Sequence, residues 1–456
     1  MNKRVVVAIT IMMALLLMAA GAGVERSQAA QEPALTINMV HIFGGAQDSR
    51  SQIIEAMADD FFAQTNIRVN VTSTSTDYTE LFNQAVQAAG QGNAPHIVQV
   101  EEGLTRLAAD SGLFVPISDI ATPEQLASLD DLLPTVRSYY QIGEVTWSVP
   151  WNASNPILYY NRGMFEAAGL DPDSPPRTFD EMLTACEAIS AVQEELGIAA
   201  CANWPMVSWF PEQWVAMQNG LVANNDNGRS APATEMLYDS PEMLTVVNWW
   251  AEMARRGYYI YSGRPHDYNG EGITFLSKRT AMTINSTAGL TLFQTFSLAQ
   301  GIDLGTARLP IPNETATNGV TVGGASLWVT AGHPEAELRA AADFIFFMTS
   351  TENDIRWHQG TGYFPTRISS VEQLEASGWF EQNPAFGIAI GQIRDSVGNI
   401  ANAGAIVGPS TEARMALIQA IQSIVDGGED VETALAAAKA AAARVLADYN
   451  LLVGGN

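Results

Sequence analysis

The chain has 456 residues, 49 acidic and 23 basic, and a formal net charge of −26. This length predicts two or three domains, and a charged fraction of only 16% argues against a disordered polyelectrolyte or a coiled coil. The acidity excludes nucleic-acid binding, and five scattered histidines with two cysteines predict no metal site and no cofactor.

The first thirty residues resemble an export signal. Two basic residues precede the apolar run Val5–Ala20, which is followed by the small-residue stretch Gly21–Ala30. An uncleaved anchor helix is the alternative, but the run is short for a bilayer span. We therefore expect cleavage near Ala29 or Ala30 and a periplasmic or extracellular product. No cysteine lies near the cleavage site, so a lipoprotein anchor is not expected.

Strand-like and helix-like segments alternate along the rest of the chain. Strands are expected at 35–43, 67–72, 97–100, 156–160 and 320–329, and helices at 51–64, 78–89, 104–111, 335–348, 410–425 and 431–449. The initial βαβαβ order predicts a largely parallel sheet covered by helices on both faces. No linker separates the units, so the fold class is α/β with two interleaved domains.

The two cysteines have a structural interpretation. Cys186 lies in a helical pattern, and Cys201 lies in an apolar segment after Gly197. A helix followed by a returning strand would bring them together, and an oxidising compartment favours a disulfide. Two buried thiols are the alternative.

Motifs for catalysis are missing from the sequence. There is no G-x-S-x-G elbow, no H-E-x-x-H metal motif, and no Gly-Lys-Ser/Thr after Gly44-Gly45. Glu101 and Glu102 are adjacent on a strand, so their side chains point to opposite faces and would not flank one bond. The chain is therefore not expected to be an enzyme.

Binding features are better represented. The segment Gly408–Arg414 is typical of a helix start, with Ser410 as N-cap and Arg414 one turn inside, an arrangement suited to an anion. A surface arginine paired with Glu412 is the alternative. Trp204, Trp209 and Trp214 suit a cleft that stacks on a polyol, sugar or quaternary ammonium, although core packing is the simpler explanation for any one of them.

Three strings carry a family resemblance: VPWNASNPILYYN at 149–161, GGASLWV at 323–329 and WHQGTGYFP at 357–365. The first resembles the domain-crossing segment of the family 1 extracellular solute-binding proteins, the substrate-capturing subunits of ABC importers. The other two are most similar to the subgroup that binds sn-glycerol-3-phosphate. The resemblance extends over nearly the whole mature chain.

This resemblance implies a type II-like periplasmic-binding-protein fold, with two discontinuous lobes joined by hinge segments and closing over a ligand. Residues 31–154 and 326–365 would form the N-lobe, and residues 155–325 and 366–456 the C-lobe. The implied partners are a small-molecule ligand and the permease subunits of the importer, and the chain is expected to be a monomer.

The resemblance also implies a ligand site. Arg414, Tyr363, Ser286 and the Gly324 amide would hold a phosphate. Trp209 would pack on glycerol, and Glu102 and Ser154 would bind its hydroxyls, with Tyr78 also in the cleft. Two stretches, 40–45 and 203–214, depart from the family pattern, and the second leaves open whether Trp209, Trp204 or Trp214 lines the cleft.

We therefore expect the chain to capture glycerol-3-phosphate or a glycerophosphodiester such as glycerophosphocholine for import. The alternative is a neutral oligosaccharide-binding protein on the same scaffold. A secreted glycosidase or phosphodiesterase is a remote third hypothesis.

Overall fold

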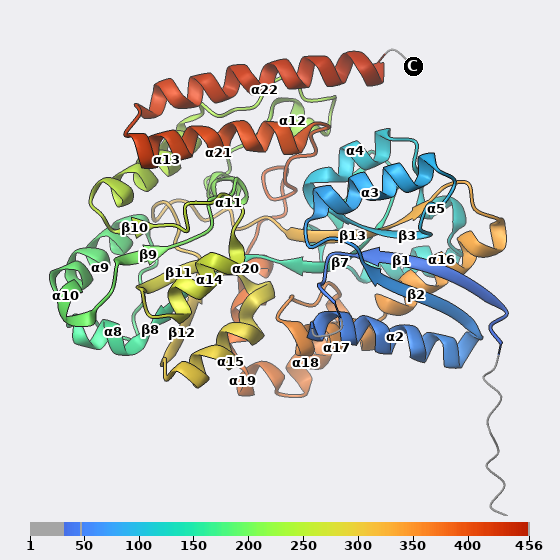
Figure 1. The fold of residues 1–456 in the computed structure, drawn as a ribbon, viewed down its shortest axis with the longest axis horizontal. Helices are drawn as coiled ribbons and strands as arrows, with labels where there is room; N and C mark the ends of the chain where they lie inside the picture. The colour runs from blue at the N-terminus through green and yellow to red at the C-terminus, as the bar shows by residue number, and fades with distance from the viewer. Residues whose placement is uncertain (1–31, 46–47, 455–456) are drawn as a thin grey trace, which may run out of the picture.

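The computed structural model describes residues 32–45 and 48–454 (Figure 1). The predicted signal peptide and its cleavage site lie outside these residues. Two sheets, each covered by helices, form two lobes side by side (Figure 1), which confirms the predicted two-lobed α/β fold. None of the described helices has the length and apolar character needed to cross a bilayer.

The first lobe is built on a sheet of order β2-β1-β3-β13-β4, with β7 also paired to β13. Its strands are β1 (Leu35–His41), β2 (Ile67–Ser73), β3 (Ile97–Glu101), β4 (Phe114–Val115), β7 (Val149–Ser154) and β13 (Gly323–Thr330). Its principal helices are α2 (Ser49–Thr65), α3 (Tyr78–Gly90), α4 (Thr105–Asp110), α5 (Ile117–Ile120), α16 (Glu335–Met348) and α17 (Thr351–Thr361).

The second lobe is built on a sheet of order β10-β9-β11-β8-β12. Its strands are β8 (Pro156–Asn161), β9 (Ala200–Asn203), β10 (Tyr259–Ile260), β11 (Thr280–Ser286) and β12 (Leu304–Arg308). Its principal helices are α8 (Arg162–Ala167), α9 (Phe179–Ala191), α11 (Trp209–Met217), α13 (Pro241–Arg255), α14 (Tyr268–Leu276), α15 (Leu290–Gln300), α20 (Pro384–Arg394), α21 (Ser410–Gly427) and α22 (Val431–Gly454).

The chain passes between the sheets more than once. β7 ends in the first sheet at Ser154, and β8 begins in the second sheet at Pro156. β13 then returns to the first sheet, antiparallel to β3, β4 and β7, whereas β1, β2 and β3 are mutually parallel as the βαβαβ order predicts. The lobes are therefore discontinuous in sequence, and the first sheet is mixed because a returning strand enters its middle.

β13 shows why the first sheet is buried on both faces. Leu327 packs into the cluster beneath α2 and α16, while its neighbour Trp328 packs into the cluster on the other face with Phe114. Successive strand residues point to opposite faces, so a strand covered on both sides shows a continuous apolar run.

Cys186 on α9 and Cys201 on β9 form a disulfide. Both residues are fully buried in the core of the second lobe, where α9 packs on β9. The bond closes a short loop within this lobe and lies in its core.

One predicted helix cap is wrong. Helix α21 begins at Ser410, its N-cap is Pro409, and no side chain caps it. Ser410 has already adopted helical backbone angles, so its hydroxyl cannot reach the amides of the first turn as an N-cap would.

Candidate functional site

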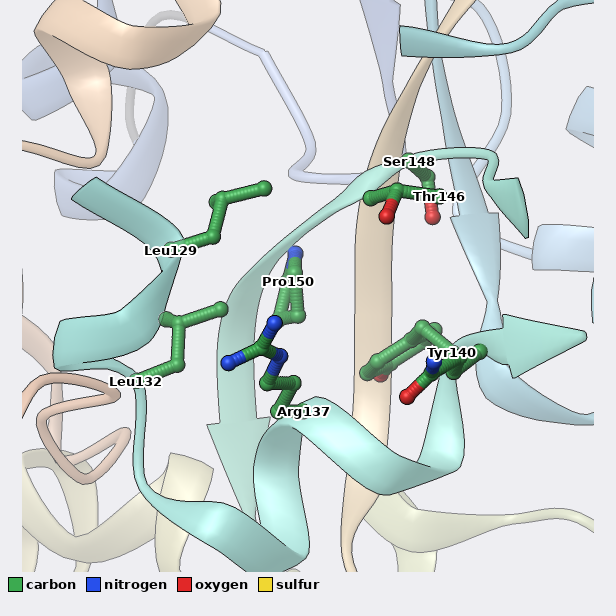
Figure 2. Close-up of a pocket in the computed structure, with 8 residues that line it drawn as sticks. Leu129, Leu132, Arg137, Tyr140, Thr146, Ser148 and Pro150 are labelled. Atoms are coloured by element: carbon green, nitrogen blue, oxygen red, sulfur yellow. The ribbon is translucent and has the colours of Figure 1, made fainter. Parts of the chain in front are cut away.

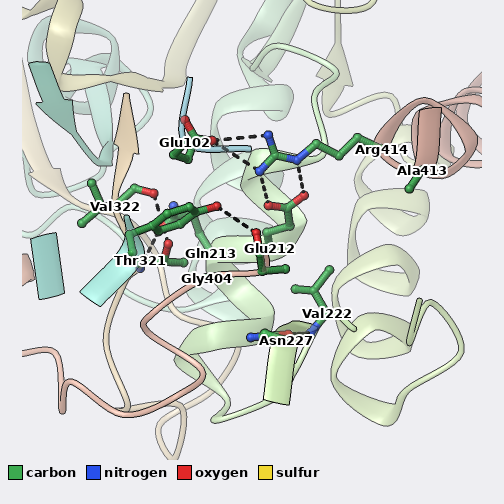
Figure 3. Close-up of polar contacts among 12 residues, drawn as sticks. Glu102, Glu212, Gln213, Val222, Asn227, Thr321, Val322, Gly404, Ala413 and Arg414 are labelled. Atoms are coloured by element: carbon green, nitrogen blue, oxygen red, sulfur yellow. Dashed lines mark hydrogen bonds and ion pairs between the residues drawn. The ribbon is translucent and has the colours of Figure 1, made fainter. Parts of the chain in front are cut away.

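The guanidinium of Arg414 lies where the two lobes meet, between two carboxylates (Figure 3). Its Nε donates to Glu212 Oε1 at 2.9 Å, and its Nη2 donates to Glu212 Oε2 at 2.7 Å. Nη1 and Nη2 each donate to Glu102 Oε1 at 3.3 Å. Arg414 on α21 and Glu212 on α11 belong to the second lobe, whereas Glu102 follows β3 in the first, so this cluster joins the lobes.

Glu102 lies in the short 3-10 helix Glu102–Leu104 after β3 and is only 3% exposed. Its Oε2 accepts a hydrogen bond from the Gly324 amide at 3.1 Å, so this amide is already engaged. Burial, reinforced by the charge of Glu101, raises the pKa of Glu102 to about 8, although Arg414 acts in the opposite direction. The cluster thus contains a carboxyl group that takes up a proton easily.

Tyr78 and Tyr363 come together around Asn152. Asp77 caps α3, placing Tyr78 at its first position, and Asn152 Nδ2 donates to the Tyr78 hydroxyl at 2.9 Å. Gln99 Nε2 in turn donates to Asn152 Oδ1, which fixes the orientation of the amide. Burial raises the pKa of both tyrosines, so both hydroxyls stay protonated at neutral pH and can donate a hydrogen bond to a ligand.

Trp209, at the start of α11, packs against β13. A Cβ at Gly323 would lie 2.4 Å from the indole ring, so only glycine allows this approach. Gly323 is paired in register with Ser154 on β7, which brings the predicted residues Trp209 and Ser154 to the same part of the lobe junction. The Trp209 indole nitrogen is buried and has no partner among the described residues.

The other two tryptophans of the 203–214 stretch are core residues. Trp204 stacks on Trp249 at 5.3 Å between ring centroids, and both Trp204 and Trp214 are fully buried. Trp214 also donates from Nε1 to Pro310 O. Their rings therefore stabilise the second lobe rather than face a solute.

Ser286 ends β11, and its hydroxyl accepts a hydrogen bond from the Ala288 amide at 3.2 Å. It lies beside Thr287, whose carbonyl oxygen approaches Gly362 so closely that a Cβ there would stand 2.5 Å away. The segments carrying the predicted residues Ser286 and Tyr363 are therefore neighbours.

A small cavity lies away from these residues, between the segment 128–140 and β7. Figure 2 shows Leu129 and Leu132 on one side and Thr146 and Ser148 on the other. Its volume is about 20 Å³, which is room for about one water molecule and not for a solute.

His96, His333 and Glu337 form a separate cluster at the amino-terminal end of β3. His96 Nδ1 accepts a hydrogen bond from the Asn38 amide, so its Nε2 carries the proton and donates to Glu337 Oε2 at 2.9 Å. That nitrogen is therefore unavailable to a metal, and the cluster is a hydrogen-bonded connection between β3 and α16.

The sequence did not indicate three residues of the junction. Glu212 forms an ion pair with Arg414. Asn152 lies between Tyr78 and Tyr363 and hydrogen-bonds the Tyr78 hydroxyl. Arg50 lies near the same two tyrosines and forms an ion pair with Asp48 at 2.6 Å. Asn152 lay within the crossing string and Glu212 within the departing stretch 203–214. Their roles depend on contacts between segments far apart in the chain, which no local pattern encodes.

A model of the bacterial extracellular solute-binding protein family matches residues 56–388. The chain belongs to this family. Its members capture solutes for ABC importers outside the cytoplasm, so the predicted family and its transport role are confirmed. The relatives found are binding proteins rather than enzymes.

Several relatives of this solute-binding protein are sn-glycerol-3-phosphate-binding periplasmic proteins named UgpB. That of Rhizobium meliloti (strain 1021) is 28% identical over 403 residues, covering 87% of this chain and 90% of the relative. That of Escherichia coli (strain K12) is 27% identical over 394 residues, covering 84% and 86%.

Solved structures of solute-binding proteins share the fold. UgpB from Mycobacterium tuberculosis in complex with glycerophosphocholine has a TM-score of 0.74 at 20% identity, covering 91% of this chain and 99% of that chain. The GacH receptor of Streptomyces glaucescens, solved unliganded and with acarbose, has a TM-score of 0.74 at 18% identity, with coverages of 91% and 99%.

Proposed function

We propose that this solute-binding protein captures a glycerol phosphate, either glycerol-3-phosphate or a glycerophosphodiester, between its lobes and delivers it to the permease subunits of an ABC importer. The observation that carries this proposal is the buried Arg414 at the lobe junction, in a chain related to UgpB proteins over most of its length. An arginine shielded from water is the side chain best suited to recognise a phosphate.

The ligand-binding residues proposed here are those expected from the sequence: Tyr78, Glu102, Ser154, Trp209, Ser286, Gly324, Tyr363 and Arg414. Three contacts support this set. Glu102 accepts hydrogen bonds from both Arg414 and Gly324, and Trp209 packs on the glycine that pairs with Ser154.

The protein would be exported as a monomer, with its signal peptide removed near Ala29 or Ala30. Its N-lobe would comprise residues 31–154 and 326–365, and its C-lobe residues 155–325 and 366–456. The passage from β7 to β8 at 154–156 supports the first hinge. Solute capture would change the balance between open and closed lobes, and the permease would recognise the closed form.

A neutral oligosaccharide is the second candidate solute. One observation favours it: two carboxylates accept hydrogen bonds from the guanidinium of Arg414, which leaves fewer N–H donors to bind an anion.

Isothermal titration calorimetry with glycerol-3-phosphate, glycerophosphocholine, maltose and trehalose distinguishes the two. We expect saturable binding of at least one glycerol phosphate and none of either sugar. Binding of a sugar alone would establish the second candidate, and turnover of a chromogenic glycoside or phosphodiester would identify an enzyme instead.

A further inference from the structure

Most of the hydrogen-bonding capacity of Arg414 is already used. A guanidinium has five N–H donors. The four hydrogen bonds described above go to Glu212 and Glu102, so only one N–H remains for a solute. A phosphate could gain the usual two parallel hydrogen bonds only if one carboxylate withdrew.

The two carboxylates do not hold Arg414 equally. Glu212 binds it through two parallel hydrogen bonds of 2.9 and 2.7 Å, whereas both contacts to Glu102 are 3.3 Å and use one oxygen. Burial also raises the pKa of Glu102 to about 8, which favours its neutral form. A solute entering the junction would therefore displace Glu102 first and leave the Glu212–Arg414 pair intact.

The position of Glu212 is fixed by its helix. Gln213, the next residue, accepts a hydrogen bond from the Thr321 amide at 3.0 Å, which ties α11 to the segment before β13 (Figure 3). Trp209 precedes Glu212 by three residues, so both side chains lie on the same face of α11. Glu212 is only 8% exposed, which keeps its charge shielded from water.

The retained pair has no net charge. Arg414 and Glu212 cancel, and Glu101 lies close enough for its carboxyl group to be influenced by both of them. A phosphomonoester dianion would bring two negative charges into this site with no excess cation to compensate them. A phosphodiester brings only one negative charge, because two of its four phosphate oxygens are esterified.

We propose that Glu212 is the specificity-determining residue of this site, which holds Arg414 in a neutral pair and so selects phosphodiesters against phosphomonoesters. This inference rests on the proposed glycerol phosphate function and adds which class of phosphate the site accepts. A salt bridge with a purely structural role would stabilise the lobe without affecting this selectivity.

The test compares the wild type with Glu212→Gln, a near-isosteric change that removes the charge. Glu412→Gln is the matched control, because Glu412 is exposed and lies on the same helix two residues before Arg414. Calorimetry with glycerol-3-phosphate, glycerophosphocholine and inorganic phosphate gives the affinities, and thermal melts report folding. If Glu212→Gln does not fold, Glu212→Met removes the charge with an apolar side chain of similar length.

We expect the wild type to bind the diester at least tenfold more tightly than the monoester. Glu212→Gln should tighten monoester and inorganic phosphate binding at least tenfold, and Glu412→Gln should leave the ratio unchanged. Two results would overturn the role of Glu212. One is equal affinity of the wild type for the diester and the monoester, and the other is an equal loss of affinity for both ligands in Glu212→Gln. If neither glycerol phosphate binds any variant but Glu212→Gln gains inorganic phosphate, the role of Glu212 stands and the proposed function fails.

Discussion

Gly324 on β13 faces the carbonyl oxygen of Asn152 on β7 so closely that a Cβ there would stand 1.9 Å from that oxygen. Its φ is +121°, a conformation that favours glycine. The pairing of the two strands shifts register between Gly324 and Ser326. This irregular pairing directs the Gly324 amide at Glu102, so the glycine links the strand geometry to the lobe junction.

Gly324→Ala should therefore destabilise the protein by about 3 kcal/mol or more, since the backbone strain adds to a contact with a main-chain atom that cannot move aside. Gly112→Ala is the control, because Gly112 has φ +68° but a Cβ added there would meet no other atom within 4 Å. It should cost only about 1 kcal/mol. Urea unfolding measures both, and equal losses would contradict the close approach.

Trp209→Ala should weaken solute binding at least tenfold while costing less stability than Trp204→Ala. Trp209 lies at the lobe junction against Gly323, whereas Trp204 is fully buried among Trp249 and Tyr259. Truncating a fully buried tryptophan costs about 3–5 kcal/mol. Titration calorimetry and urea unfolding separate the two effects. Unchanged affinity in Trp209→Ala would remove this residue from the site.

Arg414→Met should destabilise the protein by about 3–5 kcal/mol, because it leaves the buried carboxylate of Glu212 without its cation. Adding Glu212→Gln to this variant should restore a measurable part of that loss, since one uncompensated charge disappears. A double-mutant cycle in urea measures this coupling. Strictly additive losses would mean that the Arg414–Glu212 pair contributes nothing to stability.

Acid should destabilise the protein through two buried histidines. Burial lowers the pKa of His41 and of His358 from 6.5 to about 4. The unfolded chain therefore binds protons at a higher pH than the folded chain does. The stability due to each histidine is fully present above pH 6.5 and is lost as the pH falls toward 4, by up to about 3 kcal/mol per group.

His358 offers the test of this pH dependence. Its Nδ1 donates to Tyr363 O at 2.8 Å, and its ring packs between Phe380 and Phe386, so His358→Leu fills the apolar surroundings and removes the titrating group. Unfolding free energies at pH 6.5 and pH 4.5 should differ less in this variant than in the wild type. The same difference in both would show that folding does not lower the pKa of His358.

Reduction of the Cys186–Cys201 disulfide should lower stability by about 3 kcal/mol, because the bond closes a loop with a sequence separation of 15 residues. Ser replacements of both cysteines, unfolded in urea with and without dithiothreitol, measure the effect. The wild type should lose stability on reduction, and the double variant should be insensitive to the reductant.

Local pattern was sufficient for most of the secondary structure. The helix predicted at 335–348 has the bounds Glu335–Met348, and the strand at 67–72 is extended by one residue to Ser73. Apolar periodicity reports which face of an element is buried, and this information is contained in the segment itself. The N-cap of α21 was missed because a cap depends on the exact backbone angles of one residue, Ser410.

Motifs along the chain were sufficient to assign the family, the two-lobed class and the segments that carry polar residues suited to a solute. What those residues do to one another depends on contacts that form only in the folded protein. The helix that carries Arg414 predicts an anion-binding residue, yet Glu212, 202 positions earlier, binds it through two hydrogen bonds. The physical reason is that the electrostatic character of a buried charge is set by the groups packed around it, and these come together only when the chain folds.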